Sequence, residues 1–307
     1  MARGNRTVGL QRPGGSAIAA PFMTVALRHG AGRASTLDLT PDPSFAARQR
    51  MEIRDLADAA RLWRLCWTLA WLDIRLRYRG SVLGPFWLTL STAAMVGSMG
   101  VVYAFLFHMD SREYLPFLAL SLVLWGYLNA LVTDGCLTYT TVEAMIRSMR
   151  MPYSLYGARV VMRNLLVLAH NVVVIVAVFV TLRVWPGVTA LLVLPGLVLW
   201  LADSLAVCVL LGALCARFRD IPPIVGSIMQ MAFFISGVIW KPNQLGAREW
   251  LLDFNPFFSL LEVVRAPLLG EVPSAFVWVS AAVYSVVLCA TSWLLFARVR
   301  NRIAFWV

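Results

Sequence analysis

Residues 86–107 have the sequence FWLTLSTAAMVGSMGVVYAFLF, a run of 22 residues without a charged side chain. An α-helix rises about 1.5 Å per residue, so about 20 apolar residues cross the roughly 30 Å hydrocarbon core of a bilayer. Apolar residues make up 60% of the 307-residue chain and charged residues only 14%. Soluble domains carry about 25% charged residues. The sequence therefore predicts an integral membrane protein.

Five further apolar runs follow, and together they predict an all-α integral membrane fold with six transmembrane helices. The expected spans cover about 86–107, 114–136, 164–182, 188–216, 224–240 and 274–297. Pro195 and Asp203 interrupt the fourth run, which we expect to tilt or kink. The fifth run is short and contains Gln230. These spans form one six-span domain over residues 81–307.

Two segments precede the spans. Residues 1–50 contain many Gly, Pro, Ser and Arg residues without apolar periodicity, which predicts a disordered tail, and Met51 is an alternative start. Residues 51–80 place Trp63, Trp67 and Trp71 at helical spacing among arginines. This pattern is typical of an amphipathic helix that lies in the membrane interface. A solvated helix packed on its own protein is the alternative.

The orientation of the spans follows from the Lys and Arg residues that flank them, because cytoplasmic loops carry an excess of these residues. With the N-terminus in the cytoplasm, only five of the 27 Lys and Arg residues fall on the outer side. These are Arg112, Arg183, Lys241, Arg248 and Arg265. The sequence therefore predicts that both termini, and the helix at 51–80, are cytoplasmic.

Common motifs of catalytic and metal sites are absent from the sequence. It has no GxxxxGK[ST] phosphate loop, no HExxH and no GxSxG. His29, His108 and His170 are far apart in the predicted topology, and the five cysteines include no CxxC pair. We expect neither a metal site nor an active site on this chain.

Three polar residues lie deep in the predicted spans: His170 and Asn171 in the third, and Asp203 in the fourth. Buried polar groups in membranes need partners and are often functional. Interhelical hydrogen bonds that hold the bundle together are the first interpretation. A proton relay, or a pair between His170 and Asp203, is the alternative and would suit an ion-coupled carrier.

The predicted cytoplasmic loop between the second and third spans has an amphipathic pattern. Its apolar side comprises Val142, Met145, Ile146 and Met149, and its charged residues are Glu143, Arg147 and Arg150. Glu143 and Arg147 are four residues apart and can pair on a helix surface. The pattern indicates a short helix that presses into a groove on a partner, or a turn that lies on the bilayer.

Residues 241–271, after the fifth span, are too polar to cross the membrane and too apolar to be free in water. Asn255 and Pro256 form a turn signal in their middle, and Glu262 and Arg265 follow. We expect a re-entrant or surface helical segment at the outer face, between the fifth and sixth spans.

Three of these segments resemble ABC-2 type permeases that export polysaccharides. RYRGSVLGPFW at 77–87 is similar to the stretch that leads into that family's first span. RFRDI at 217–221 resembles its motif between spans four and five. Asn255-Pro256, with Glu262 and Arg265, resembles its outer re-entrant segment. The resemblance covers residues 52–307 and is to O-antigen and capsule export permeases, although their usual pattern lacks the tail.

The resemblance implies that two permease chains pair with two copies of a separate ATPase subunit. That subunit would bind ATP and Mg²⁺, so this chain would need no cofactor and would not itself be an enzyme. Residues 142–150 would form the coupling helix that sits in the ATPase groove. The contacting residues would be Val142, Glu143, Met145, Ile146, Arg147, Met149 and Arg150.

The resemblance also implies a role for the helix at 51–80, as a gate at the cytoplasmic mouth near a lipid-linked head group. Cations favour anionic head groups such as a pyrophosphate, whereas ordinary positive-inside flanking is the alternative reason for these arginines. The gate residues would be Trp67, Trp71, Arg75, Arg77, Tyr78 and Arg79.

The expected function is export of a lipid-linked polysaccharide, of the O-antigen or capsule type, across a bacterial inner membrane. Sugar rings stack on aromatic faces, so a glycan path would be lined by aromatic residues. The candidates are Tyr103, Trp125, Tyr127, Phe233, Phe234 and Trp240. Expected partners are the ATPase, a second copy of the chain, the glycan and membrane lipids, but no nucleic acid. An ABC-2 permease for a drug or lipid is the alternative, followed by an ion-coupled carrier or a membrane enzyme.

Overall fold

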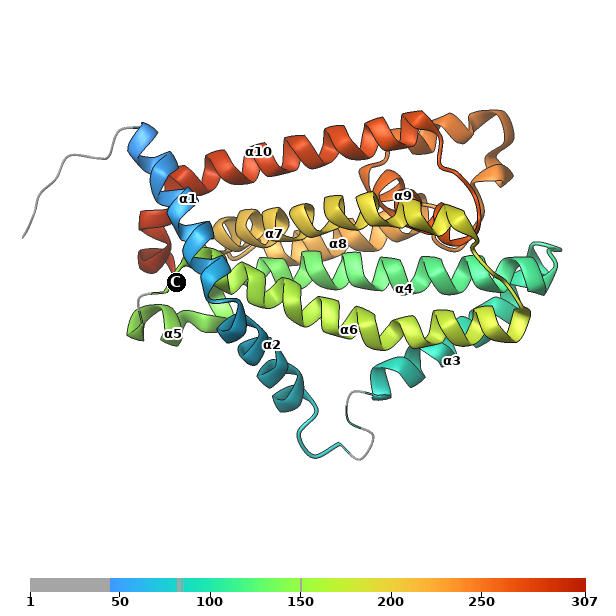
Figure 1. The fold of residues 1–307 in the computed structure, drawn as a ribbon, viewed down its shortest axis with the longest axis horizontal. Coiled ribbons are helices and arrows are strands. Elements are labelled where there is room, and N and C mark those ends of the chain that lie inside the picture. Colours follow the sequence, from blue (N-terminus) through green and yellow to red (C-terminus); the bar gives the residue numbers. More distant parts are fainter. Residues whose placement is uncertain (1–44, 82–83, 85, 150) are drawn as a thin grey trace, which may run out of the picture. The chain divides into compact units, whose positions relative to one another are not determined.

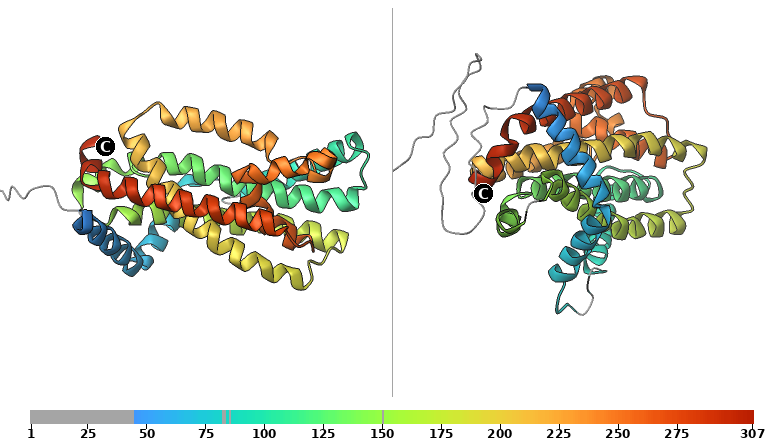
Figure 2. Two further views of the ribbon diagram at one scale, coloured as in Figure 1. Left: turned by 90° about the horizontal axis from the view of Figure 1, so that it is seen from above. Right: turned by 60° about the vertical axis from the view of Figure 1, so that its left-hand side comes forward.

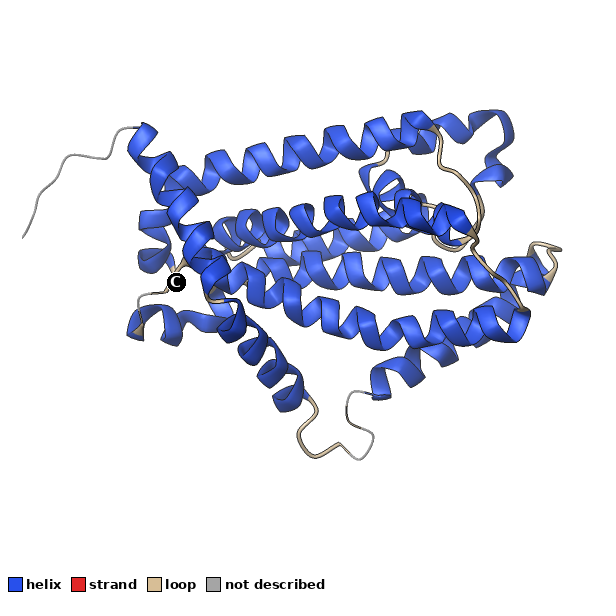
Figure 3. Ribbon diagram, viewed as in Figure 1, coloured by secondary structure: helices blue, strands red, loops and turns tan. Residues whose placement is uncertain are grey.

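The structure is a computed structural model that describes residues 45–81, 84, 86–149 and 151–307. The chain divides into two units, Met1–Ala47 and Arg48–Val307. Most of the first unit, and with it most of the predicted tail, lies outside the described residues. Throughout the described part the chain forms helices, turns and loops without a strand, which confirms the predicted all-α class (Figure 3).

Five helical segments are long and apolar enough to cross a membrane. They are α3 (Phe86–Leu106), α4 (Ser111–Cys136), α6 (Tyr153–Leu182), α7 (Val193–Arg217) with the preceding 3₁₀ turn η2 (Val188–Leu192), and α10 (Ala275–Trp306). They lie side by side in Figure 1. The apolar helix α8 (Ile221–Ile235) has only 15 residues. The described residues therefore contain five candidate spans, where the sequence predicts six.

Two helix boundaries differ from the predicted spans for the same reason. α6 begins at Tyr153 rather than near 164, and α10 continues to Trp306 rather than ending near 297. Each added stretch contains arginines, which the prediction placed outside the spans. Ion pairs hold Arg159, Arg163 and Arg300 within these helices instead.

The end of α8 also differs from the end of the predicted fifth span, and the reason is a glycine. α8 ends at Ile235 rather than near 240. Gly237 has a φ of +59°, a conformation that glycine adopts without a steric penalty and that a continuing helix does not allow. The chain therefore turns after Ser236, and residues 236–240 return toward the bundle core, where Val238 is fully buried.

Short helices occupy the two ends of the bundle. One end, called here the α5 end, carries α1 (Phe45–Arg61), α2 (Trp63–Arg77), the turn η1 (Thr140–Val142) and α5 (Glu143–Ser148). The opposite end, the α9 end, carries η3 (Pro242–Phe254) and α9 (Pro256–Leu268). The predicted helix at 51–80 is thus two helices with a break at Leu62. Figure 2 shows both crossing the bundle obliquely.

The core of the bundle is centred on α4. In its most apolar stretch 72% of the residues are buried, against 17% in α3 and in α6. The outward faces of the peripheral helices carry exposed apolar side chains such as Phe105, Val198 and Val286. Such faces suit hydrocarbon rather than water. Gly196 of α7 allows the backbone of α9 to approach closely. A Cβ atom at position 196 would lie only 3.0 Å from the Val263 carbonyl oxygen.

Candidate functional site

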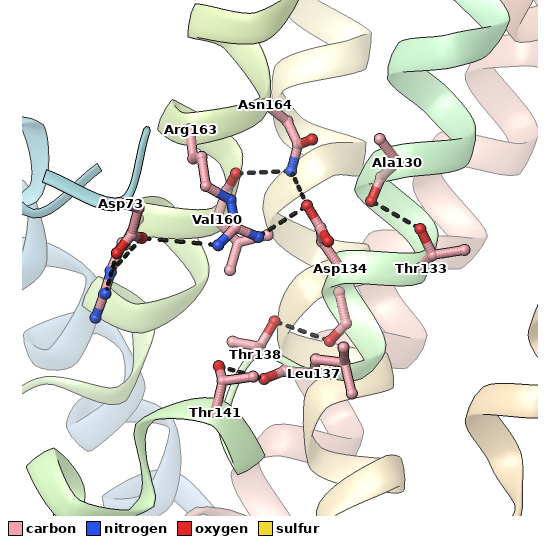
Figure 4. A network of polar contacts seen from close by, with 12 residues as sticks. Asp73, Ala130, Thr133, Asp134, Leu137, Thr138, Thr141, Val160, Arg163 and Asn164 are labelled. Atoms are coloured by element: carbon pink, nitrogen blue, oxygen red, sulfur yellow. Dashed lines mark hydrogen bonds and ion pairs between the residues drawn. The ribbon is translucent and has the colours of Figure 1, made fainter. Parts of the chain in front are cut away.

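Charged side chains from three helices meet at the α5 end. This arginine cluster consists of Asp73 on α2, Asp134 on α4, and Arg159, Arg163 and Asn164 on α6 (Figure 4). Arg159 and Arg163 are four residues apart and therefore share one face of α6. The cluster therefore connects α2 to α6, and α6 to the central helix α4, through ion pairs.

The contacts within the arginine cluster form a continuous chain. Arg159 binds Asp73 through two hydrogen bonds, of which the one from Nε measures 2.8 Å. Arg163 lies 2.8 Å from Asp134 through one terminal nitrogen and 3.7 Å from Asp73 through the other. Asn164 donates a further hydrogen bond of 3.0 Å to Asp134.

The side chains of the arginine cluster are mostly shielded from solvent, with the four charged ones 15–22% exposed. Ion pairs in such surroundings lose much of their Coulomb energy to desolvation, but removing one partner leaves a costly lone charge. Arg159 and Arg163 also keep one buried nitrogen each without a hydrogen-bond partner. The cluster is therefore suited to hold α2 in one position and to exchange partners when α2 moves.

A second group of contacts fastens α1 to the bundle through Asp55, whose side chain is fully buried. Its carboxylate accepts hydrogen bonds from the backbone amides of Tyr153 and Ser154, at 3.1 and 2.8 Å. It also accepts from the Ser154 hydroxyl at 2.6 Å and from Arg300 at 2.7 Å. The first amides of a helix have no partner within it, so Asp55 caps α6 from another helix.

The residues predicted for the gate lie on the outer side of α2 and just after it. Trp67, Trp71, Arg75, Arg77 and Arg79 are exposed and Tyr78 is half-buried. The opposite side of α2 buries Cys66, Ala70 and Ile74. The Arg75 guanidinium lies 5.5 Å from the centre of the Trp71 ring. An apolar, aromatic face with cations on it is what an interfacial helix presents.

The predicted ion pair of the 142–150 segment is present: Arg147 lies 2.7 Å from Glu143 on α5. Arg147 also donates a hydrogen bond of 2.6 Å to the Val307 carbonyl at the end of the chain. The apolar side of the segment is occupied, since Val142, Met145 and Ile146 pack against a cluster that includes Tyr139, Tyr156 and Val209 of the same chain. Glu143, Ala144, Arg147, Ser148 and Met149 remain exposed, and Arg150 lies outside the described residues.

The six aromatic residues predicted for a cargo path differ in how deeply they are buried. Trp125 and Tyr127 are buried in the core of α4. The Tyr127 hydroxyl lies 2.7 Å from that of Ser204, and its ring stacks on Trp200. Tyr103, Phe233 and Trp240 are half-buried and pack against the same core. Tyr103 stacks on Phe107, Phe233 contacts Trp125, Phe234 is 60% exposed, and Trp240 donates a hydrogen bond to the Phe234 carbonyl.

The three polar residues predicted inside the spans form hydrogen bonds to other residues and not to one another. Ser285 of α10 donates to Asp203 of α7 at 2.7 Å, which is an interhelical bond of the expected kind. Asn171 of α6 likewise accepts from Thr92 of α3 at 3.4 Å. The His170 ring is hydrogen-bonded to the Leu166 carbonyl of its own helix, so the alternative pair with Asp203 is not formed. Among the described residues, no group of three or more His, Cys, Asp or Glu is placed to hold a metal ion.

At the α9 end, the structure brings together the two charged residues that the sequence singled out. Arg265 is fully buried and donates to Glu262 at 2.9 Å, to Ser121 at 2.9 Å and to the Gly237 carbonyl at 2.7 Å. Its guanidinium carbon lies 4.5 Å from the centre of the Phe117 ring. Arg265 therefore joins α9 to α4 and to the turn after α8.

Asn255 caps the first turn of α9, at the position where the sequence predicts a turn. Its side chain accepts hydrogen bonds from the amides of Phe257 and Phe258, at 3.0 and 3.4 Å. It also donates one of 2.9 Å to the Ser236 hydroxyl. Pro256 follows at the first helical position, where a missing N–H has no consequence.

Apolar helices of membrane-spanning length, joined by buried polar contacts at both ends, define a multi-pass helical membrane protein. The described residues offer no metal cluster, and the sequence contains no phosphate-binding loop. The chain belongs to the ABC-2 type transporter family, whose sequence profile matches residues 64–269.

Two relatives carry the same name. The chain is 25% identical over 201 residues to the O-antigen export system permease protein RfbA of Myxococcus xanthus, covering 63% of this chain and 76% of that protein. It is 21% identical over 196 residues to the O-antigen export system permease protein RfbA of Klebsiella pneumoniae, covering 62% and 74%.

Proposed function

We propose that this chain is the permease subunit of an ABC exporter that moves a lipid-linked polysaccharide outward across the bacterial inner membrane. The observation that carries the proposal is the similarity to two O-antigen export permeases, over about three quarters of each of them. Two copies of this chain would form the path, and a separate ATPase subunit would bind ATP and Mg²⁺ and supply the energy.

The proposed topology places the α5 end in the cytoplasm. The excess of arginine in the segments at that end supports this orientation. α8 would be the sixth span, short and completed by the buried return of residues 236–240. η3 and α9 would form the re-entrant segment at the outer face, anchored by Arg265.

ATP-driven movement of the ATPase would reach this chain through α5. Since Val142, Met145 and Ile146 pack on their own chain, the ATPase would contact the exposed charged side, made of Glu143, Arg147 and their neighbours. The apolar residues would then transmit the push into the bundle rather than fill the groove of the partner.

The gate would be α2, with its tryptophans in the membrane interface and its arginines near the anionic head group of the cargo. Asp73 anchors α2 to Arg159 of α6, and Arg163 continues the contact to Asp134 of α4. Partner exchange in this arginine cluster would let α2 move while the spans stay packed.

A second candidate function is export of an apolar or lipid cargo by the same type of machine. The observation that favours it is a cavity of about 440 Å³ between α4, α7, α8, α9 and α10. Its walls are almost wholly apolar and include Trp200, Met229 and Leu288. Such a cavity suits an acyl or polyprenyl chain better than a sugar.

The experiment that tests these functions is transport in reconstituted vesicles. This chain would be purified with its partner ATPase, and ATP-driven movement of lipid-linked glycan would be measured against the same lipid without glycan. Glycan movement that stops with a hydrolysis-defective ATPase supports the first function. Equal movement of the glycan-free lipid supports the second. If no ATPase co-purifies and neither cargo moves, both proposals are wrong.

A further inference from the structure

One side of α1 carries three polar residues spaced three apart, and this α1 seam consists of Gln49, Glu52 and Asp55. Two of them have partners: Gln49 accepts a hydrogen bond from the Trp293 ring nitrogen of α10, and Asp55 holds α6 and Arg300. Glu52, in the middle, is only 1% exposed, and neither of its carboxylate oxygens has a hydrogen-bond partner. The seam thus buries one carboxyl group without compensation.

Glu52 borders a cavity of about 140 Å³ between α1, α6, α7 and α10. The hydrogen-bond donors around the cavity are committed elsewhere. The Ser154 hydroxyl donates to Asp55, the Ser292 hydroxyl donates to the Ala206 carbonyl, and Trp293 donates to Gln49. None of these three lining groups is left to donate to Glu52, and the unpartnered Nε of the neighbouring Arg300 makes no hydrogen bond to it. Protonation neutralises the Glu52 carboxylate without a donor from the protein.

The charged and titratable groups around Glu52 oppose one another. Arg300 of α10 favours the ionised form, Asp55 on the same helix disfavours it, and Cys289 of α10 lines the cavity. α6 contributes Ser154 to the lining, and α7 contributes only apolar residues. Arg48, one turn earlier on α1, makes no hydrogen bond to Glu52. Burial outweighs Arg300 and raises the pKa of Glu52 from 4.5 to about 7.

We propose that Glu52 is a proton switch for the position of α1, which docks on α6 and α10 when Glu52 is protonated and loosens when it is ionised. α2 follows α1 directly after Leu62, so loosening of α1 would also release one end of the proposed gate helix. The switch depends only on the burial of the Glu52 carboxyl group without a hydrogen-bond partner, and not on the identity of the cargo.

The direction of the pH effect follows from linkage. When α1 is loose, Glu52 is solvated and titrates at its ordinary pKa of 4.5; when α1 is docked, it titrates at about 7. Between these values the docked state binds more protons, so docking weakens as the pH rises. The docking equilibrium falls by up to about tenfold per pH unit within this window and is constant above it.

The test is hydrogen–deuterium exchange of the full chain in lipid nanodiscs, measured at about pH 5.5, 6.5 and 8 and corrected for intrinsic exchange. In the wild type we expect protection of residues 48–61 to fall between the first and last pH, while peptides from α4 and α7 stay constant. Glu52→Gln and the apolar Glu52→Met, which cannot titrate, are expected to give a flat profile. Glu249→Gln, at an exposed position in η3, is the matched control and should follow the wild type.

A second measurement keeps the proposal testable if the variants loosen α1 for structural reasons. Infrared difference spectra between low and neutral pH should show a protonated carboxyl band that both Glu52 variants lose and Glu249→Gln keeps. A flat wild-type exchange profile, or the same pH-dependent loss of protection in both Glu52 variants, overturns the proton switch. Neither outcome bears on glycan transport, so failure here is distinct from failure of the proposed function.

Discussion

Asp55 of α1 accepts a hydrogen bond of 2.7 Å from Arg300 of α10, although 245 residues separate the two in the chain. The same carboxylate also caps the first turn of α6. One side chain therefore fixes the ends of two spans and the helix that crosses them. Because the cap is supplied from outside α6, its loss would affect the packing of α1 as well as the helix itself.

Asp55→Ala is expected to lower the free energy of unfolding by about 3–5 kcal/mol, because it removes the cap and leaves the Arg300 charge largely buried without a partner. Thermal unfolding of the detergent-solubilised protein measures this as a drop of several degrees in the midpoint. Asp58→Ala is the matched control, since Asp58 is exposed and its pair with Arg61 is 3.5 Å long. Equal midpoints for the two variants would contradict the capping role.

Arg163→Ala should also destabilise the protein by about 3–5 kcal/mol, because it leaves Asp134 without its cation in a shielded site. Removing both charges should cost less than removing one. In a double-mutant cycle, Arg163→Gln/Asp134→Asn is therefore expected to be more stable than the sum of the single changes predicts. Additive effects in unfolding midpoints would show that the two side chains do not interact.

The function of the arginine cluster can be separated from its contribution to stability. Asp73→Asn removes the anchor of α2 but leaves the pair between Arg163 and Asp134 in place. If α2 is the gate, transport should become less dependent on ATP while the rest of the bundle stays folded. Asp58→Asn, which changes an exposed carboxylate on α1, should change stability by less than about 0.5 kcal/mol and serves as the comparison.

The helical class and most of the spans could be predicted from the sequence, because uncharged apolar runs of membrane length are typical of transmembrane helices. The helices α6 and α10 extend beyond the predicted spans, because arginines there are held within the helices by partners distant in sequence. Arg163 and Asp134 look like ordinary flanking charges in the sequence. A sign that could have revealed them is the spacing of Arg159 and Arg163, four apart on what had to be one helix face.

The predicted sites differ in how local the evidence for them was. The pair of Glu143 and Arg147 lies within one helical turn, and it is present as expected. The aromatic path depends on which helix faces turn toward the path and stays a prediction, although Trp125 and Tyr127 are buried within this chain. Periodicity within a span that is apolar on all sides gives no direction, so such residues cannot be assigned from sequence.

Arg265 should be the least replaceable charged residue at the α9 end. Arg265→Lys keeps the charge but loses the planar group that reaches Glu262, Ser121 and the Gly237 carbonyl together. We expect even this change to cost about 3 kcal/mol or more, because buried acceptors lose their donor. Yield and thermal midpoint of the purified protein measure the effect. Arg248→Lys, at an exposed position in η3, should leave both unchanged.

Glu143→Ala provides the sharpest test of the coupling role of α5. The Glu143 side chain is 48% exposed and its pair with Arg147 spans one helical turn, so the pair contributes only about 0–1 kcal/mol to stability. We therefore expect an unchanged thermal midpoint but a clear loss of ATP-driven glycan transport. Arg147→Ala is less informative, because it also removes the hydrogen bond to the Val307 carbonyl.

The matched control for Glu143→Ala is Glu249→Ala, which changes an exposed glutamate of η3, at the end of the bundle opposite the proposed ATPase surface. Binding of the ATPase to each variant in the same membranes separates docking from transmission. Loss of binding places Glu143 in the contact itself, whereas retained binding with lost transport places it in the transmission of movement. Full transport by Glu143→Ala would contradict the coupling role, because the variant lacks the carboxylate that is proposed to contact the ATPase. The ATPase would then engage another part of this chain.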